Sequence, residues 1–225
     1  MNRLLLFALA FFPAITLADP VSGPERWEGD MKKFSARDKA TPPEPDALLF
    51  VGSSSIRMWD LGKSWPDTNV VNNGFGGSTL ADSIYHFDTL FGPQDPKAII
   101  IYAGDNDIAK GLTPKETLED FKTLADKIRA KFPEVPVIYI AIKPSIKRWE
   151  LWPTMKEAND LIETYSNSRP DFYFADIATP MLKEAADSPP SEDWFVQDGL
   201  HLSEKGYRRW TNVVNRHLKS AGVVD

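Results

Sequence analysis

The sequence predicts a single-domain α/β protein, a three-layer α/β/α sandwich around a doubly wound parallel sheet of about five strands. The first observation is a series of short apolar runs without polar alternation, which is typical of strands buried on both faces. The second is that helical patterns separate these runs, as they do where helices connect parallel strands. The third is a length of 225 residues with a hydrophobic share of 42%, which suits one domain with a full core.

Residues 1–18 are predicted to be a secretory signal peptide that precedes the fold. Arg3 supplies a positive start, Leu4–Leu17 is apolar, and residues 16–18 place small side chains at the −3 and −1 positions of a cleavage site. The apolar run contains Pro13 and is short for a membrane span, which needs about 20 residues. We therefore expect an exported protein, periplasmic or secreted, without an integral membrane segment after signal removal. A short uncleaved anchor is the alternative.

Residues 19–46 are expected to form an N-terminal helical arm followed by a Pro-rich linker. Trp27, Met31 and Phe34 recur at i, i+4 and i+7, so residues 25–39 predict one amphipathic helix that packs on the domain. Three prolines then break the helix and lead into the body of the protein.

Five apolar runs are expected to form the sheet of the main domain, residues 47–219. Each run is short and ends in polar, Gly or Pro residues, as buried strands do. The runs are Ala47–Val51, Asn69–Val71, Ala98–Ala103, Val135–Ile142 and Phe172–Ala175.

Two of the helices between and after these strands have clear start signals. Thr113 is a predicted N-cap, with Pro114 in the first turn and Glu116 at the capping-box position. Pro133 ends the apolar stripe that follows. Ser203 is the predicted cap of the last helix.

Polar and glycine-rich residues collect where three of the predicted strands end. The first strand runs into Gly52–Ser55, the second into Asn72–Ser78 and the third into Gly104–Asp107. Ligands of open parallel sheets bind beyond the carboxyl ends of the strands, so these segments are expected to share one site.

A fourth segment, Asp198-Gly199-Leu200-His201, places a carboxylate three residues before an imidazole in a predicted turn. Such a loop can hold the carboxylate against one ring nitrogen and leave the other free to take a proton. The other two histidines, His86 and His217, fall in predicted helices, so His201 is the candidate base. A hydroxyl, backbone N–H groups, a carboxamide and an Asp–His pair together make up the parts of a serine acyl hydrolase.

The chain resembles the SGNH hydrolases, also called the GDSL-type esterase and lipase family, over about residues 47–218. Four blocks match in order and at plausible spacing. They are Phe50–Ile56, Asn72-x-Gly74-x-x-Gly77, Gly104-x-Asn106-Asp107 and Asp198-x-x-His201. The family's nucleophile stands two residues after the first glycine, at Ser54, with Ser53 and Ser55 as neighbouring alternatives. Ser53 occupies the place of the family's usual Asp.

The resemblance implies a flavodoxin-like sheet and a catalytic triad, with no metal and no cofactor. Ser54 would attack an ester carbonyl, His201 would take and return the proton, and Asp198 would orient His201. The oxyanion donors would be the backbone N–H groups of Ser54 and Gly77 and the side-chain amide of Asn106. Glycine at position 77 would let the substrate oxygen approach the backbone without meeting a Cβ.

The charge and cysteine content exclude several kinds of partner. After signal removal 25 basic residues stand against 32 acidic ones, because only Arg3 is lost. An acidic chain without a basic run argues against nucleic acid and against anionic lipid headgroups as partners. The absence of cysteine removes thiol nucleophiles and zinc–thiolate sites. The expected partner is a small-molecule ester substrate, and nothing in the sequence indicates an oligomeric state.

Other functions remain open at this point. A deacetylase of O-acetylated sugars would use the same triad. A non-catalytic glycan-binding protein would stack sugars on tryptophans in predicted loops, although ordinary packing is the simpler interpretation; these are Trp149, Trp152 and Trp194. A metal-dependent phosphoesterase would need a set of hard oxygen ligands with one imidazole, namely Asp105, Asp107, Asp198 and His201.

The family resemblance does not choose among ester substrates. No long apolar lid is apparent, which favours a small or short-acyl ester. Residues Lys143–Pro153 carry three cations and two tryptophans, and we expect them to form part of the pocket wall.

Overall fold

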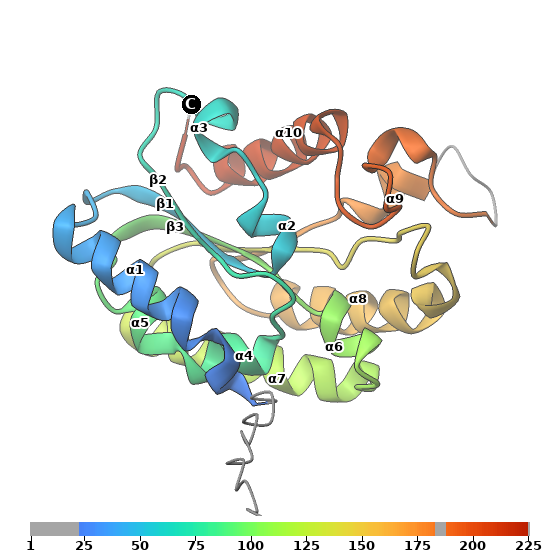
Figure 1. Cartoon of the computed structure of the whole chain (residues 1–225), viewed down its shortest axis with the longest axis horizontal. Helices are drawn as coiled ribbons and strands as arrows, with labels where there is room; N and C mark the ends of the chain where they lie inside the picture. The colour runs from blue at the N-terminus through green and yellow to red at the C-terminus, as the bar shows by residue number, and fades with distance from the viewer. Residues whose placement is uncertain (1–22, 183–187, 225) are drawn as a thin grey trace, which may run out of the picture.

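The computed structural model describes residues 23–182 and 188–224, and the signal peptide predicted for residues 1–18 lies outside them. Within these residues, five parallel strands form one sheet in the order β2-β1-β3-β4-β5. Helices lie on both sides of the sheet (Figure 1), which confirms the predicted flavodoxin-like α/β/α fold. The strands are β1 (Ala47–Gly52), β2 (Val70–Gly74), β3 (Pro96–Tyr102), β4 (Val137–Ile140) and β5 (Phe172–Ala175).

Two strands differ in length from the prediction. Strand β2 continues to Gly74, since residues 72–74 pair with the end of β1 and are not yet loop. Strand β4 begins only after Pro136, which has no N–H to donate to a neighbouring strand.

Helices cover both faces of the sheet. They are α1 (Glu28–Ala40), α2 (Ser54–Arg57), α3 (Leu61–Ser64), α4 (Leu80–Tyr85), α5 (Phe87–Phe91), α6 (Asp105–Ala109), α7 (Pro114–Lys131), α8 (Trp152–Asn167), α9 (Ala178–Leu182) and α10 (Glu204–Ser220). The described residues also contain 3₁₀ turns at Pro24–Trp27, Trp149–Leu151 and Glu192–Trp194.

Alternate residues of each strand point into two separate apolar cores. Leu48 and Phe50 pack against helices α2, α3, α9 and α10 on one face. Leu49 and Val51 pack against α1, α4, α5, α7 and α8 on the other face. Both faces of the strands are therefore buried, which explains why their sequences show no polar alternation.

The N-terminal arm folds as a 3₁₀ turn followed by α1, close to the expected span, and packs beside α5. Met31 is buried in the second core, with Trp27 and Phe34 packed against it. Arg26 forms an ion pair of 2.6 Å with Asp82 of α4, and Arg37 donates to the carbonyl of Asn72 in β2. The arm is thus fixed to the same side of the molecule as the loop that follows β2.

The predicted helix starts are present. Thr113 and Glu116 form a reciprocal capping box at the start of α7, and Ser203 accepts a hydrogen bond from the N–H of Gly206 in α10. His86 lies at the break between α4 and α5, and His217 lies in α10. In the described part of the chain, no helix combines the length and hydropathy that a membrane span requires.

Candidate active site

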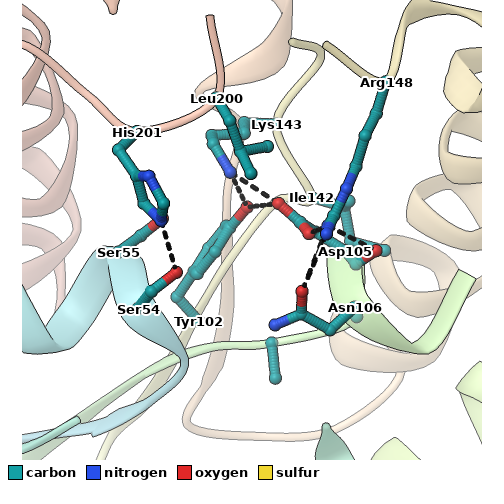
Figure 2. Close-up of polar contacts among 12 residues, drawn as sticks. Ser54, Ser55, Tyr102, Asp105, Asn106, Ile142, Lys143, Arg148, Leu200 and His201 are labelled. Atoms are coloured by element: carbon teal, nitrogen blue, oxygen red, sulfur yellow. Dashed lines mark hydrogen bonds and ion pairs between the residues drawn. The ribbon is translucent and has the colours of Figure 1, made fainter. Parts of the chain in front are cut away.

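Three segments meet at the carboxyl edge of the sheet: the loop after β1, the loop after β3 and the segment before α10. Ser54 is the first residue of α2, and Asn106 lies in the first turn of α6. His201, 147 positions after Ser54, approaches from the loop before α10 (Figure 2). Its Nε2 lies 3.0 Å from the Ser54 hydroxyl oxygen, which is within reach for proton transfer.

Asp198 holds the other side of the imidazole. Its Oδ2 lies 2.6 Å from His201 Nδ1, and its Oδ1 accepts the backbone N–H groups of Leu200 and His201, both at 2.9 Å. Partial burial opposes ionisation, but the hydrogen bonds from His201 and from the two amides outweigh it and lower the Asp198 pKa to about 2. A charged carboxylate at Nδ1 fixes the tautomer in which Nε2 accepts a proton from serine.

The turn between β1 and α2 selects Ser54 from three consecutive serines. Ser53 and Ser55 are buried, with exposed fractions of 2% and 1%, whereas Ser54 is partly exposed and contacts His201. Gly52 makes this turn possible, because it has a φ of +142° and a Cβ there would lie 1.9 Å from the carbonyl oxygen of Tyr102.

The other two predicted oxyanion donors, Asn106 and Gly77, lie on neighbouring loops. The Asn106 Nδ2 donates to the carbonyl of Ser78, next to Gly77, at 3.0 Å, so the two loops are joined directly. Gly77 has a φ of +77°, and a Cβ at this position would meet nothing closer than Trp27 at 3.8 Å. Glycine is therefore favoured here by its left-handed backbone, in addition to the substrate approach expected from the sequence.

Asp107 connects the loop after β3 to the start of α4. Its carboxylate accepts the N–H of Leu80 at 2.9 Å and that of Gly104 at 3.0 Å, and its side chain is fully buried. Burial raises the Asp107 pKa to about 6, against the effect of these hydrogen bonds.

The four ligands of the metal-dependent alternative do not come together. Asp107 is used by backbone amides, and Asp105 is paired with Lys143 and Arg148. Across residues 23–182 and 188–224, no three His, Cys, Asp or Glu side chains are grouped so that they could hold a metal ion.

A buried cluster beside the site was not predicted. Lys143 was expected in a pocket wall, but it is 1% exposed, and its ammonium contacts the Tyr102 hydroxyl at 3.0 Å and Asp105 Oδ2 at 2.5 Å. Burial lowers its pKa to about 7, and the electrostatic interactions with Tyr207 and Asp198 oppose that effect. Arg148 pairs with the other oxygen of Asp105 and donates to Asn106 Oδ1. The one feature of the sequence that could have indicated this cluster is the position of Lys143, directly after the apolar run that contains β4.

The three tryptophans considered for sugar stacking have different surroundings. Trp194 is 3% exposed and belongs to the first core, which excludes it as a stacking platform and agrees with ordinary packing. Trp149 lies in a 3₁₀ turn and Trp152 opens α8, and both are half-buried.

The profile of the GDSL-like lipase/acylhydrolase family matches residues 55–209, well over half of the chain. The chain belongs to this family. The match begins one residue after Ser54 and includes the blocks around Gly77, Asn106 and the Asp198–His201 pair. Membership places the protein among carboxylic ester hydrolases.

Known relatives of low sequence identity support the same family assignment. The chain is 24% identical to GDSL esterase/lipase WDL1 of Oryza sativa subsp. japonica over 216 residues, covering 80% of each chain. It is 20% identical to an arylesterase of Vibrio mimicus over 176 residues, covering 69% of this chain and 80% of the relative. A GDSL-like lipase from Bacteroides thetaiotaomicron shares the fold, with a TM-score of 0.71, 19% identity and coverage of 85% of this chain and 98% of that one.

Proposed function

We propose that this protein hydrolyses carboxylic esters through an acyl-enzyme on Ser54. The main support is the continuous series of hydrogen bonds from Ser54 through His201 to Asp198. Ser54 Oγ lies 3.0 Å from His201 Nε2, and His201 Nδ1 lies 2.6 Å from Asp198 Oδ2. The family assignment and the names of the relatives, an esterase/lipase and an arylesterase, support ester chemistry.

The proposed reaction has two halves. Ser54 Oγ attacks the ester carbonyl while His201 Nε2 takes the hydroxyl proton, and His201 then gives that proton to the leaving alcohol. Water attacks the acyl-enzyme with the same base, and the free acid and the Ser54 hydroxyl result. Asp198 stays ionised throughout and stabilises the imidazolium.

The negative oxygen of each tetrahedral intermediate needs hydrogen-bond donors already in place. The proposed donors are the N–H groups of Ser54 and Gly77 and the amide of Asn106. Loss of one such donor typically lowers turnover by about 10²–10³.

The test is hydrolysis of p-nitrophenyl acetate by single variants. We expect Ser54→Ala and His201→Ala to abolish turnover nearly completely, and Asn106→Ala to leave a measurable rate. Ser53→Ala and Ser55→Ala are the matched controls and should retain activity. A serine-directed phosphonate should label the peptide that contains Ser54, in the presence of a chelator. Full activity in Ser54→Ala would refute the proposal.

For the substrate we propose a small or short-acyl ester. A panel of p-nitrophenyl esters from acetate to palmitate, with acetylated xylose and a lysophospholipid beside it, tests this choice. Highest kcat/KM for the acetylated sugar would move the function to a deacetylase on the same triad, and highest kcat/KM for palmitate would move it to a lipase.

We also propose that the protein is exported. Its expression in a Gram-negative host with its own leader should yield a periplasmic or secreted chain that begins at Asp19, as N-terminal sequencing would determine. A chain that retains Met1 in the cytoplasmic fraction would refute export.

A further inference from the structure

We infer that Arg148 is a positioning residue of the proposed reaction, which fixes the carboxamide of Asn106 so that its N–H faces the oxyanion. Asp105 and Lys143 in turn fix Arg148. This inference rests on the proposed function, and it assigns a role to residues outside the triad and the three oxyanion donors.

The first step concerns the carboxamide itself. An Asn side chain has an oxygen end and a nitrogen end of similar shape, so that a half-turn about its last bond replaces a donor by an acceptor. In an oxyanion hole that exchange would turn a stabilising N–H into a repelling oxygen. A side chain that serves as an oxyanion donor therefore needs both ends fixed.

Arg148 and Ser78 fix the two ends of Asn106. Both terminal nitrogens of the Arg148 guanidinium donate to Asn106 Oδ1, each at 3.1 Å (Figure 2). The carbonyl of Ser78 takes one hydrogen of Asn106 Nδ2 at 3.0 Å. A guanidinium has no acceptor, so the flipped amide would lose both bonds. The second hydrogen of Nδ2 is left for the substrate oxygen.

Arg148 is itself fixed by a buried carboxylate. It contacts Asp105 Oδ1 and donates to the Asp105 carbonyl at 3.1 Å. The other carboxylate oxygen accepts from Lys143 at 2.5 Å and from the Tyr102 hydroxyl at 3.1 Å. Asp105 and Lys143 are almost completely buried, with side-chain exposures of 6% and 1%. Such a network leaves the guanidinium little freedom to rotate.

The charge of the guanidinium also acts in the direction that the reaction needs. A cation at the oxygen end of the carboxamide polarises it and strengthens its N–H as a donor. Arginine suits this place better than lysine, because its planar fork can reach Asp105 and Asn106 at once and keeps its charge at every pH of interest.

The test is a double-mutant cycle on kcat and KM for p-nitrophenyl acetate, with the variants Arg148→Met, Asn106→Ala and the pair together. We expect Arg148→Met to lower kcat by about 10- to 100-fold, a part of the loss of a whole donor, with KM nearly unchanged. In the Asn106→Ala background the same change should lower kcat by less than about 3-fold, because the carboxamide that Arg148 positions is absent. Arg148→Lys should recover part of the rate.

Arg169→Met is the matched control, because this arginine pairs with Asp126 beyond the far end of α8. It should leave kcat unchanged. Equal losses from Arg148→Met in both backgrounds would overturn the inference, and so would a raised KM with kcat unchanged, which would make Arg148 a substrate-binding group. If Arg148→Met does not fold, the same cycle is run with Arg148→Lys, and its effects on kcat with and without Asn106→Ala are compared in the same way. An active Ser54→Ala would instead refute the proposed function itself.

Discussion

The buried carboxylate of Asp107 predicts a stability that changes with pH in a defined direction. Its pKa is raised from 3.8 to about 6, so between these values the folded protein keeps a proton that the unfolded chain has lost. The folded state binds more protons there, and the free energy of unfolding therefore falls as pH rises from about 4 to about 6. At about 1.4 kcal/mol per pH unit, this contribution amounts to about 3 kcal/mol.

The substitution Asp107→Asn removes this titration and one hydrogen bond. Asparagine has a single oxygen, so either the N–H of Leu80 or that of Gly104 loses its acceptor, at a cost of about 1–3 kcal/mol. We expect the variant to be less stable than the wild type at pH 4.5. The difference should narrow by about 2 kcal/mol between pH 4.5 and pH 8, because the wild-type carboxylate becomes ionised in its buried position over this range.

Urea unfolding followed by tryptophan fluorescence at several pH values between 4.5 and 8 measures this difference. Asp67→Asn is the control, because Asp67 is exposed, and its variant should run parallel to the wild type at every pH. A difference between wild type and Asp107→Asn that stays constant from pH 4.5 to 8 would refute the assignment of the titration to Asp107. The variant should also lose kcat, since Asp107 joins the loop of Asn106 to the start of α4.

Three further predictions follow from the same geometry. Gly52→Ala should yield no folded protein in expression trials, because its Cβ would lie 1.9 Å from the Tyr102 carbonyl oxygen. Gly77→Ala should fold, since only its φ of +77° is unfavourable, and its free energy of unfolding measured in urea should fall by about 1–2 kcal/mol. A folded Gly52→Ala of wild-type stability would contradict the argument. Asp198→Asn should lower kcat less than His201→Ala does, and equal losses would assign Asp198 a larger part than orientation. Because the pKa of Asp198 is about 2, its carboxylate should not contribute to the pH–rate profile between pH 4 and 8, and an acid limb that disappears in Asp198→Asn would show otherwise.

The fold and the reacting groups were predictable for a physical reason. Buried strands and capped helices carry local signals, and the carboxyl ends of parallel strands converge whatever the details of the loops. This convergence predicts a hydroxyl of residues 53–55 near His201, and the resemblance to the SGNH hydrolases selects Ser54, 147 positions before His201. The end of β2 was harder to predict, because the polar residues 72–74 pair with β1 although their side chains are typical of a loop.

The supporting groups could not be predicted, because the role of a charged residue depends on its partner. Lys143 and Arg148 were expected to face the substrate as cations of a pocket wall. In the folded chain both pair with one carboxylate, Asp105, which the sequence offered equally well as a metal ligand. No local pattern distinguishes a lysine that ends a strand in solvent from one that ends it in a buried ion pair.

The links among the loops explain how the site can be rigid although its residues lie on short turns. Asp107 connects the third loop to the start of α4, Asn106 connects it to Ser78, and Arg148 connects it to the segment after β4. Each link joins two loops to each other, so the proposed donors keep their spacing without a bound substrate. Donors fixed in advance act on the transition state more than on the ground state. Breaking a link should therefore lower kcat while KM changes little, and a variant of these residues that raised KM alone would contradict this account of the site.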